Sequence, residues 1–394
     1  MQSVMPDFSL KSKVIITCNK RLSPYLQLEI AELGFEIIKT FATYVEVFAS
    51  LNDCIRLNLQ LRCASQVLYL LKQFPANHPN VLYDELKKIE WEHIIPAGGY
   101  FSVTSNVDHP TITNNLFANV KVKDAIVDRM RDASGNRPNT GPSLEQTVIN
   151  LFWREEMADI FIDTSGETLA KHGYRKIPGK APMLEALAAA TILATKWDRI
   201  SPFVNPMCGS ATIAIEAAML ATNRSPGLFR TNYSFMHVMG FDPLVYEQER
   251  RNLNEQIKTV EGLIIIASDV SEDAINISKI NAGAAGVEQL IKFELGDFAD
   301  TTIPESNSGI VFFNPEYGDR LGEEKELEIT YARLGDFMKK QCKGYTGYIF
   351  TGNLELAKKI GLKAKRRIEF FTSKIDCRLL EYELYAGTRR TDVE

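Results

Sequence analysis

A short apolar run that ends in an amide, a proline and an aromatic residue carries the clearest chemical signal in this sequence. The run ends at Phe313, and Asn314, Pro315, Glu316 and Tyr317 follow it. An exocyclic amine on a nucleobase is a poor nucleophile, because its lone pair is delocalised into the ring. The Asn314 side-chain oxygen and a backbone carbonyl near Pro315 could hold the amine and aim its nitrogen at an activated methyl group, while Tyr317 stacks on the base. The segment predicts methyl transfer to such an amine; a turn with a packed tyrosine is the alternative.

A second candidate site is the turn Asn205-Pro-Met-Cys-Gly-Ser210, which leads directly from an expected strand into an expected helix. A glycine here lets the backbone approach a ligand closely, and the N–H groups at the helix start can meet a carboxylate or a phosphate. A tight structural turn is the alternative. The phosphate-binding pattern Gly-x-x-x-x-Gly-Lys-Ser/Thr is absent, which disfavours a nucleoside triphosphate site. The candidate binding residues of this turn are Asn205, Pro206, Cys208, Gly209 and Ser210.

Two aspartates end the next two expected strands. Asp269 is placed to accept hydrogen bonds from the two hydroxyls of a ribose, and Asp297 could accept one from the amino group of an adenine. Either could instead cap a helix or a turn. A nicotinamide-binding fold uses a similar acid, about 20 residues after its Gly-x-Gly-x-x-Gly fingerprint. That fingerprint is absent here, and the separation between Gly209 and Asp269 is much longer. Both observations argue against a dehydrogenase.

Composition describes an ordinary globular chain of 394 residues, with 45% hydrophobic residues and room for two or three domains. The six cysteines and five histidines do not cluster, so we expect neither a metal site nor a disulfide scaffold. With no export or membrane segment apparent, we expect a cytoplasmic protein. The net charge of -5 argues against non-specific coating of nucleic acid. Local basic faces remain plausible at 121–131 and 358–367, with solvated surface as the alternative.

The two halves of the chain show different patterns. The first predicts an α+β region with strands at 14–17, 35–40, 44–49, 100–105, 146–153 and 157–164, and helices at 22–33, 52–74, 82–89 and 114–131. The second alternates strands at 202–205, 263–268, 291–295, 309–313 and 346–351 with helices at 183–196, 211–222, 272–284 and 326–342. Such alternation predicts a doubly wound, mainly parallel sheet. An expected hairpin at 367–371 and 375–385 adds antiparallel strands.

Taken in order, several segments resemble the THUMP-domain class I (Rossmann-like) RNA methyltransferases, most closely the bacterial 23S rRNA guanine-N2 methyltransferase family. The resemblance covers nearly the whole chain. The matching segments are 166–175, 205–210 with 216–218 and 226–228, 314–321, 334–337, 351–353 and 377–379.

The resemblance implies an α/β Rossmann-like methyltransferase domain at 183–390, joined by a linker at 166–182 to a ferredoxin-like unit at 1–55 and an RNA-gripping THUMP domain at 56–165. It implies that the turn at 205–210 and the helix start at Pro182 hold the methionine part of S-adenosyl-L-methionine. It assigns Asp269 to the ribose and Asp297 to the adenine of that cofactor. The target base falls to Asn314, which also lies beside the cofactor, with Pro315 and Tyr317. The expected partner is RNA, rRNA rather than tRNA.

Two positions depart from the family's pattern. Ala211 replaces a usual glycine, so a methyl group could disturb the cofactor loop. Glu316 replaces the second proline of Asn-Pro-Pro-Tyr and could contact guanine N1–H and N2–H, unless it only faces solvent. The alternatives kept open are a tRNA guanine-N2 methyltransferase, an adenine-N6 methyltransferase, and a non-catalytic RNA-binding assembly factor.

Overall fold

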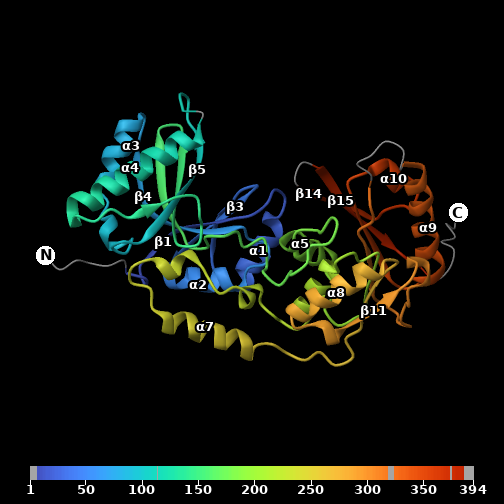
Figure 1. The fold of residues 1–394 in the computed structure, drawn as a ribbon. Coiled ribbons are helices and arrows are strands. Elements are labelled where there is room, and N and C mark those ends of the chain that lie inside the picture. Colours follow the sequence, from blue (N-terminus) through green and yellow to red (C-terminus); the bar gives the residue numbers. More distant parts are fainter. Residues whose placement is uncertain (1–6, 113, 318–323, 373–374, 386–394) are drawn as a thin grey trace. The chain divides into compact units, whose positions relative to one another are not determined.

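The computed structural model describes residues 7–112, 114–317, 324–372 and 375–385 (Figure 1). Within these limits the chain forms two units. The first unit contains 7–19, 26–169 and 226–254, and the second contains 20–25, 170–225 and the chain from 255 onward. The division falls between Leu169 and Ala170, inside the segment expected to be a linker. Residues 226–254 return to the first unit, which the sequence patterns do not indicate.

The first unit is built on an eight-stranded sheet in the order β2-β3-β1-β4-β8-β7-β5-β6. Most neighbouring strands are antiparallel, while β5 runs parallel to β6 and β7. The strands are β1 (Lys11–Thr17), β2 (Ile37–Thr40), β3 (Tyr44–Ser50), β4 (Gln66–Pro75), β5 (Tyr100–Asp108), β6 (Asn139–Thr140), β7 (Thr147–Arg154) and β8 (Met157–Asp163). The helices that accompany them are α1 (Ser23–Glu32), α2 (Leu51–Gln60), α3 (Pro79–Lys87), α4 (Asn115–Ser134) and α7 (Pro243–Glu255).

The expectation of one helix over 52–74 is wrong in its second half, where the chain forms strand β4. Helix α2 starts on a capping box between Ser50 and Asp53 and ends at Gln60. The Glu29 carboxylate then accepts hydrogen bonds from the Arg62 and Cys63 N–H groups, both at 2.9 Å. Strand β4 pairs with β1 and β8 in the middle of the sheet, so burial between two neighbours overrides the helical preference of its leucines.

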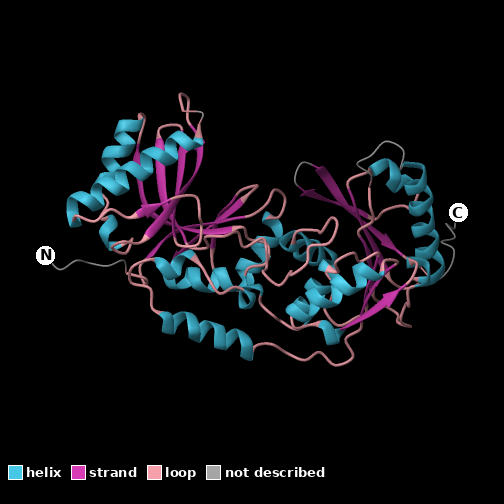
Figure 2. Cartoon of the chain, in the orientation of Figure 1, coloured by secondary structure: helices cyan, strands magenta, loops and turns pink. Residues whose placement is uncertain are grey.

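The second unit confirms the expected α/β architecture (Figure 2). Its seven-stranded sheet has the order β11-β10-β9-β12-β13-β15-β14, parallel except where β15 pairs with β13 and β14. The strands are β9 (Phe203–Pro206), β10 (Ile265–Asp269), β11 (Ile291–Leu295), β12 (Ile310–Phe313), β13 (Thr346–Thr351), β14 (Arg366–Thr372) and β15 (Ile375–Glu383). The helices are α5 (Glu185–Thr195), α6 (Thr212–Ala221), α8 (Glu272–Ala284), α9 (Glu324–Gln341) and α10 (Leu354–Lys358).

The topology of this sheet fixes where a ligand can bind. Strand β9 lies between β10 and β12, so the strand order reverses around it. In such sheets a crevice opens beyond the carboxyl ends of the strands at the reversal. The apolar core that supports these strands includes Val204, Ile266, Val311 and Phe313.

Candidate functional site

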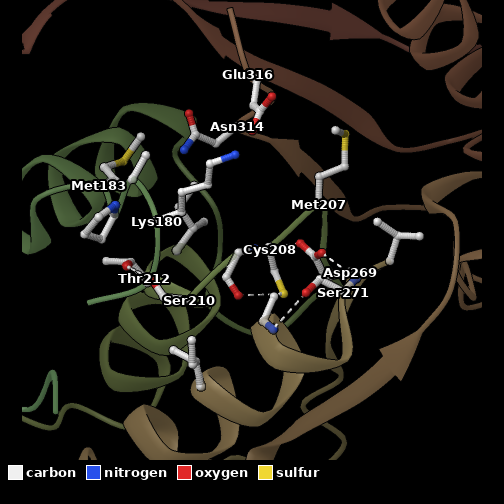
Figure 3. A pocket seen from close by; sticks show the side chains of 18 of the residues that line it. Lys180, Met183, Met207, Cys208, Ser210, Thr212, Asp269, Ser271, Asn314 and Glu316 are labelled. Carbon is white, nitrogen blue, oxygen red and sulfur yellow. Dashed lines mark hydrogen bonds between the residues drawn. The ribbon is translucent and has the colours of Figure 1, made fainter. Parts of the chain in front are cut away.

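A cavity of about 840 Å³ lies at the carboxyl ends of β9, β10 and β12 (Figure 3). Four parts of the second unit line it: the segment before α5, the turn after β9, the start of α8 after β10, and the start of α9 with the end of β12. Of the residues predicted from the sequence, Pro182, Asn205, Cys208, Gly209, Ser210, Asp269 and Asn314 line the cavity. The predicted Pro206, Asp297, Pro315 and Tyr317 do not belong to its lining.

The turn after β9 has an unusual backbone. Met207, Gly209 and Ala211 all have φ between +54° and +56°, in the left-handed region that glycine adopts freely and other residues at a cost of about 1–2 kcal/mol. The turn is held by hydrogen bonds from Gly209 N–H to Asp269 Oδ2 at 2.9 Å and from Ser278 Oγ to the Gly209 carbonyl at 2.8 Å. Backbone strain of this kind persists where the surroundings fix it, commonly at ligand sites.

Ala211 precedes the first residue of α6 and is fully buried. Its methyl group does not belong to the lining of the cavity, so the departure from glycine acts on the backbone of the turn. Ala211 is the N-cap residue of α6, and its methyl side chain cannot accept a hydrogen bond from the first N–H groups of that helix. Thr212 and Ile213, which start the helix, line the cavity, where those groups can meet an anion.

Asp269 connects the turn to the end of β10. Its second carboxylate oxygen accepts a hydrogen bond from Ser271 N–H at 3.0 Å, so both oxygens are engaged and the side chain is fixed in the cavity wall (Figure 3). Burial, with the nearby charge of Asp269, raises the pKa of the Cys208 thiol to about 12. Cys208 therefore presents a neutral thiol to the cavity at neutral pH.

Asn205 links the two central strands beneath the cavity. Its side-chain Nδ2 donates to the Phe312 carbonyl at 2.9 Å, across from β9 to β12. The Oδ1 atom has no hydrogen-bond partner within the described chain, although the residue is only 1% exposed. A buried acceptor left in this way favours a ligand that brings an N–H donor.

Some residues of the segment after β12 line the cavity, and others pack against the protein. Asn314 is half-buried and Glu316 is exposed, and both line the cavity. Pro315 is buried. The Tyr317 ring packs within 3.1 Å of the Cβ position that a side chain at Gly352 would occupy. Tyr317 thus lies against the end of β13, whereas Asn314 and Glu316 line the cavity.

Asp297 caps the short helix at Phe298–Asp300, as the capping alternative predicts. One carboxylate oxygen accepts hydrogen bonds from Ala299 N–H at 2.9 Å and from the Arg333 guanidinium at 2.7 Å. Burial alone would raise the pKa of Asp297, but these two donors outweigh it and the pKa is lowered. The contact with adenine remains a prediction.

Two residues outside the predicted binding set hold the cavity wall before α5. The Arg175 guanidinium donates to the Met183 carbonyl at 2.5 Å and to Thr212 Oγ1 at 3.0 Å, so it joins two walls of the cavity. Asn281 on α8 holds the backbone of Lys176 and Ile177. Arg175 lies in the segment 166–175 that carries the family resemblance, but no role was assigned to it there. Asn281 belongs to no such segment, and its partners lie more than 100 residues away, so no local signal could have found it.

The charges of the lining are unequal. Asp269, Asp273, Glu316 and Glu326 are acidic, and Lys180 is the one basic residue among the described lining residues. This balance suits a cationic ligand.

Several basic side chains of the two expected basic faces form internal ion pairs. Arg129 pairs with Glu92, and Arg131 pairs with Asp128 at 2.5 Å. At 358–367, lysine and arginine side chains pair with acids from the same unit. These pairs favour the solvated-surface interpretation of both stretches.

Within the described ranges, no group of three or more His, Cys, Asp or Glu side chains is arranged to hold a metal ion. In the same ranges, no helix combines the length and apolar character needed to cross a membrane.

The sheet order, with an acid at the end of β10 and a cavity at the reversal, defines the class as a Rossmann-like methyltransferase domain. Comparison with known families agrees: residues 172–381 match the RMKL-like methyltransferase domain, 13–68 the RlmL ferredoxin-like domain, and 77–163 the THUMP domain. The chain belongs to the RMKL-like methyltransferase family.

Among curated proteins, the chain is similar to the ribosomal RNA large subunit methyltransferase K/L of Methylococcus capsulatus, with 34% identity over 377 residues. This match covers 93% of the chain and 50% of the relative. The protein of the same name from Syntrophotalea carbinolica is 32% identical over 94% of the chain and 53% of its own length. The chain thus spans about half the length of the curated relatives it matches.

Solved structures similar to the chain cover nearly all of it. A possible methylase from Clostridium difficile has a TM-score of 0.86 at 29% identity, over 97% of this chain and 100% of its own. SMU.472, a proposed methyltransferase complexed with SAH, has a TM-score of 0.85 at 26% identity, over 96% of this chain and 99% of its own. A predicted N6-adenine-specific DNA methylase from Listeria monocytogenes has a TM-score of 0.85 at 29% identity, over 95% of this chain and 97% of its own.

Proposed function

We propose that the chain methylates the N2 amine of guanine in RNA, with S-adenosyl-L-methionine as methyl donor and 23S rRNA as substrate. The observation that carries this proposal is the acid-lined cavity that joins Asp269 to Asn314. The large-subunit rRNA methyltransferase names of the curated relatives support the substrate, and the SAH in the structure of SMU.472 supports the donor.

The cavity fits each part of this donor. Asp269 would accept from the ribose hydroxyls, the open start of α6 would meet the carboxylate, and Asn205 Oδ1 would accept from the ammonium group. The acidic lining suits the sulfonium, which supplies an already activated methyl group. Cys208, Gly209 and Ser210 would form the surface beneath the methionine chain. Pro182 would close the opposite wall, and Pro206 would support the turn from below.

Asn314 would orient the reactive amine. Its side-chain oxygen and the carbonyl before Pro315 would each accept one hydrogen from guanine N2, which directs the nitrogen lone pair at the methyl group. Tyr317 would stack on the base, and Asp297 would accept from the adenine amino group. Positioning of this kind can supply much of the rate enhancement, since the methyl group needs no further activation.

The first unit would bind the RNA and present the target nucleotide. The matches to ferredoxin-like and THUMP domains support this role. We retain functional boundaries at 1–55, 56–165 and 183–390, with a linker at 166–182. The six free thiols fit a reducing compartment, so we propose that the protein acts in the cytoplasm.

Adenine-N6 methylation is the second candidate, because the Listeria protein named an N6-adenine-specific DNA methylase is as similar in structure as the others. A test that separates the candidates is transfer of labelled methyl from S-adenosyl-L-methionine to total RNA from cells lacking the protein, followed by nucleoside analysis. We expect label in N2-methylguanosine of large-subunit rRNA. Label in tRNA would indicate a tRNA methyltransferase, and label in N6-methyladenosine would indicate methylation of adenine. Absence of both label and cofactor binding would favour a non-catalytic assembly factor.

A further inference from the structure

Lys180 and Glu316 are two oppositely charged side chains in one cavity, and neither has been assigned a hydrogen bond to the methyl donor or to the target base. Both are exposed and line the cavity from different segments of the chain. In Figure 3 the Lys180 side chain extends toward the end of the cavity where Asn314 and Glu316 lie. Neither residue has an ion pair with another described residue. Both charges are therefore available to a ligand held at Asn314.

The three nucleobases with exocyclic amines differ in the atoms beside the amine. In guanine, N2 lies between N1–H, which donates a hydrogen bond, and N3, which accepts one. In adenine, N6 is flanked by N1 and N7, which both accept. In cytosine, N4 lies between N3, which accepts, and a C–H group. Guanine alone presents a donor on one side of the amine and an acceptor on the other.

We propose that Glu316 and Lys180 select guanine by reading these two flanking ring nitrogens. Glu316 accepts the hydrogen bond from guanine N1–H, Lys180 donates one to N3, and Asn314 holds the amine between them. A carboxylate set against the lone pair of adenine N1 or N7 is repelled by it. Neither the carboxylate nor that ring nitrogen then gains a hydrogen bond. This inference rests on the proposed function, and it explains why an acid can replace a proline in the segment after β12.

Lys180 has a second conceivable partner, the carboxylate of the methyl donor. That carboxylate is already offered the uncapped N-terminus of α6, where Thr212 and Ile213 line the cavity. The extension of Lys180 toward Asn314 favours the base. The two partners differ in a measurable way: contact with the donor affects every acceptor substrate equally, whereas contact with N3 affects only substrates that possess it.

The test uses the full chain and synthetic RNA spanning the nucleotide that the labelling experiment identifies, with that nucleotide replaced. A 2,6-diaminopurine target retains the 2-amino group but turns N1–H into an acceptor, and a 3-deazaguanine target removes only N3. We expect wild-type kcat/KM to be about 10–100-fold lower with diaminopurine than with guanine, as for one mismatched hydrogen bond of about 1–3 kcal/mol. Glu316→Gln, whose amide can donate to N1, should shift the guanine-to-diaminopurine ratio at least tenfold toward diaminopurine.

Lys180→Met should lower kcat/KM on guanine but leave that on 3-deazaguanine nearly unchanged. Glu355→Gln and Lys258→Met are matched controls, because both residues are exposed and lie outside the cavity lining; they should leave all ratios as in wild type. Calorimetry with S-adenosyl-L-methionine shows whether each variant still folds and binds the donor.

The outcomes separate the two levels of the account. No transfer to any guanine would overturn the proposed function. Transfer to guanine with equal transfer to diaminopurine, or an unchanged ratio in Glu316→Gln, would overturn the role of Glu316 alone. Equal loss on guanine and 3-deazaguanine in Lys180→Met, with weaker donor binding, would assign Lys180 to the donor instead.

Discussion

Asn281 offers a sharp test of how the cavity wall is held in place. The residue lies on α8 and is 1% exposed. Its Oδ1 accepts hydrogen bonds from Lys176 N–H at 2.9 Å and Ile177 N–H at 3.0 Å, and its Nδ2 donates to the Ile177 carbonyl at 2.8 Å. Asn281→Ala removes all three bonds at once. The segment that they fix continues directly into the cavity lining at Pro178.

The magnitude follows from the three bonds. Each contributes about 1 kcal/mol net, so their loss should lower the local opening free energy by about 3 kcal/mol, which is about 100-fold in equilibrium. Hydrogen exchange measures this directly, because the Lys176 and Ile177 amides are themselves the donors. We expect their protection to fall about 100-fold, and donor affinity to fall with it because the wall is less ordered.

Asn254→Ala is the matched control, since the Asn254 side chain makes one exposed bond, to the Arg250 carbonyl within α7. That change should leave the protection of the Lys176 and Ile177 amides unaltered. Unchanged protection in Asn281→Ala would refute the argument that this side chain holds the segment.

Three further predictions concern packing, pH and the donor. Gly335→Ala should destabilise the protein by about 2–4 kcal/mol, seen as a lower melting temperature, because the new Cβ would lie 1.8 Å from the Ile360 carbonyl oxygen; a wild-type melting curve would contradict this. Burial raises the pKa of Asp163 from 3.8 to about 7, so the folded state keeps a proton that the unfolded chain releases, and stability from this group falls as pH rises from about 4 to 7. Asp163→Asn should make the melting temperature depend less on pH in that window, and an unchanged dependence on pH would count against this argument. Asp269→Ala should weaken binding of S-adenosyl-L-methionine about 10–100-fold in calorimetry, as expected for lost hydrogen bonds to a charged group, whereas equal affinity would exclude the ribose contact.

The sequence predicted those parts of the site that strand ends determine. Asp269 and Asn314 each follow a buried parallel strand, and adjacent parallel strands must bring their carboxyl ends to one edge. The sheet and its cavity confirm that reasoning about the fold.

The sequence did not predict features that depend on distant partners. Asn281 holds backbone atoms more than 100 residues earlier in the chain, and nothing near it marks the contact. Strand β4 was mistaken for helix because its leucines satisfy either structure until two neighbouring strands bury them. The return of 226–254 to the first unit is likewise a tertiary property: the Cβ of a side chain at Gly227 would lie 2.4 Å from Leu59 Cα.

The most direct test of the central claim compares large-subunit rRNA from cells that lack the protein with rRNA from the same cells carrying wild type or Asn314→Ala. Nucleoside mass spectrometry should find one N2-methylguanosine that is absent without the protein, restored by wild type, and not restored by Asn314→Ala at equal protein level. An rRNA nucleoside profile that does not change among the three would contradict the account.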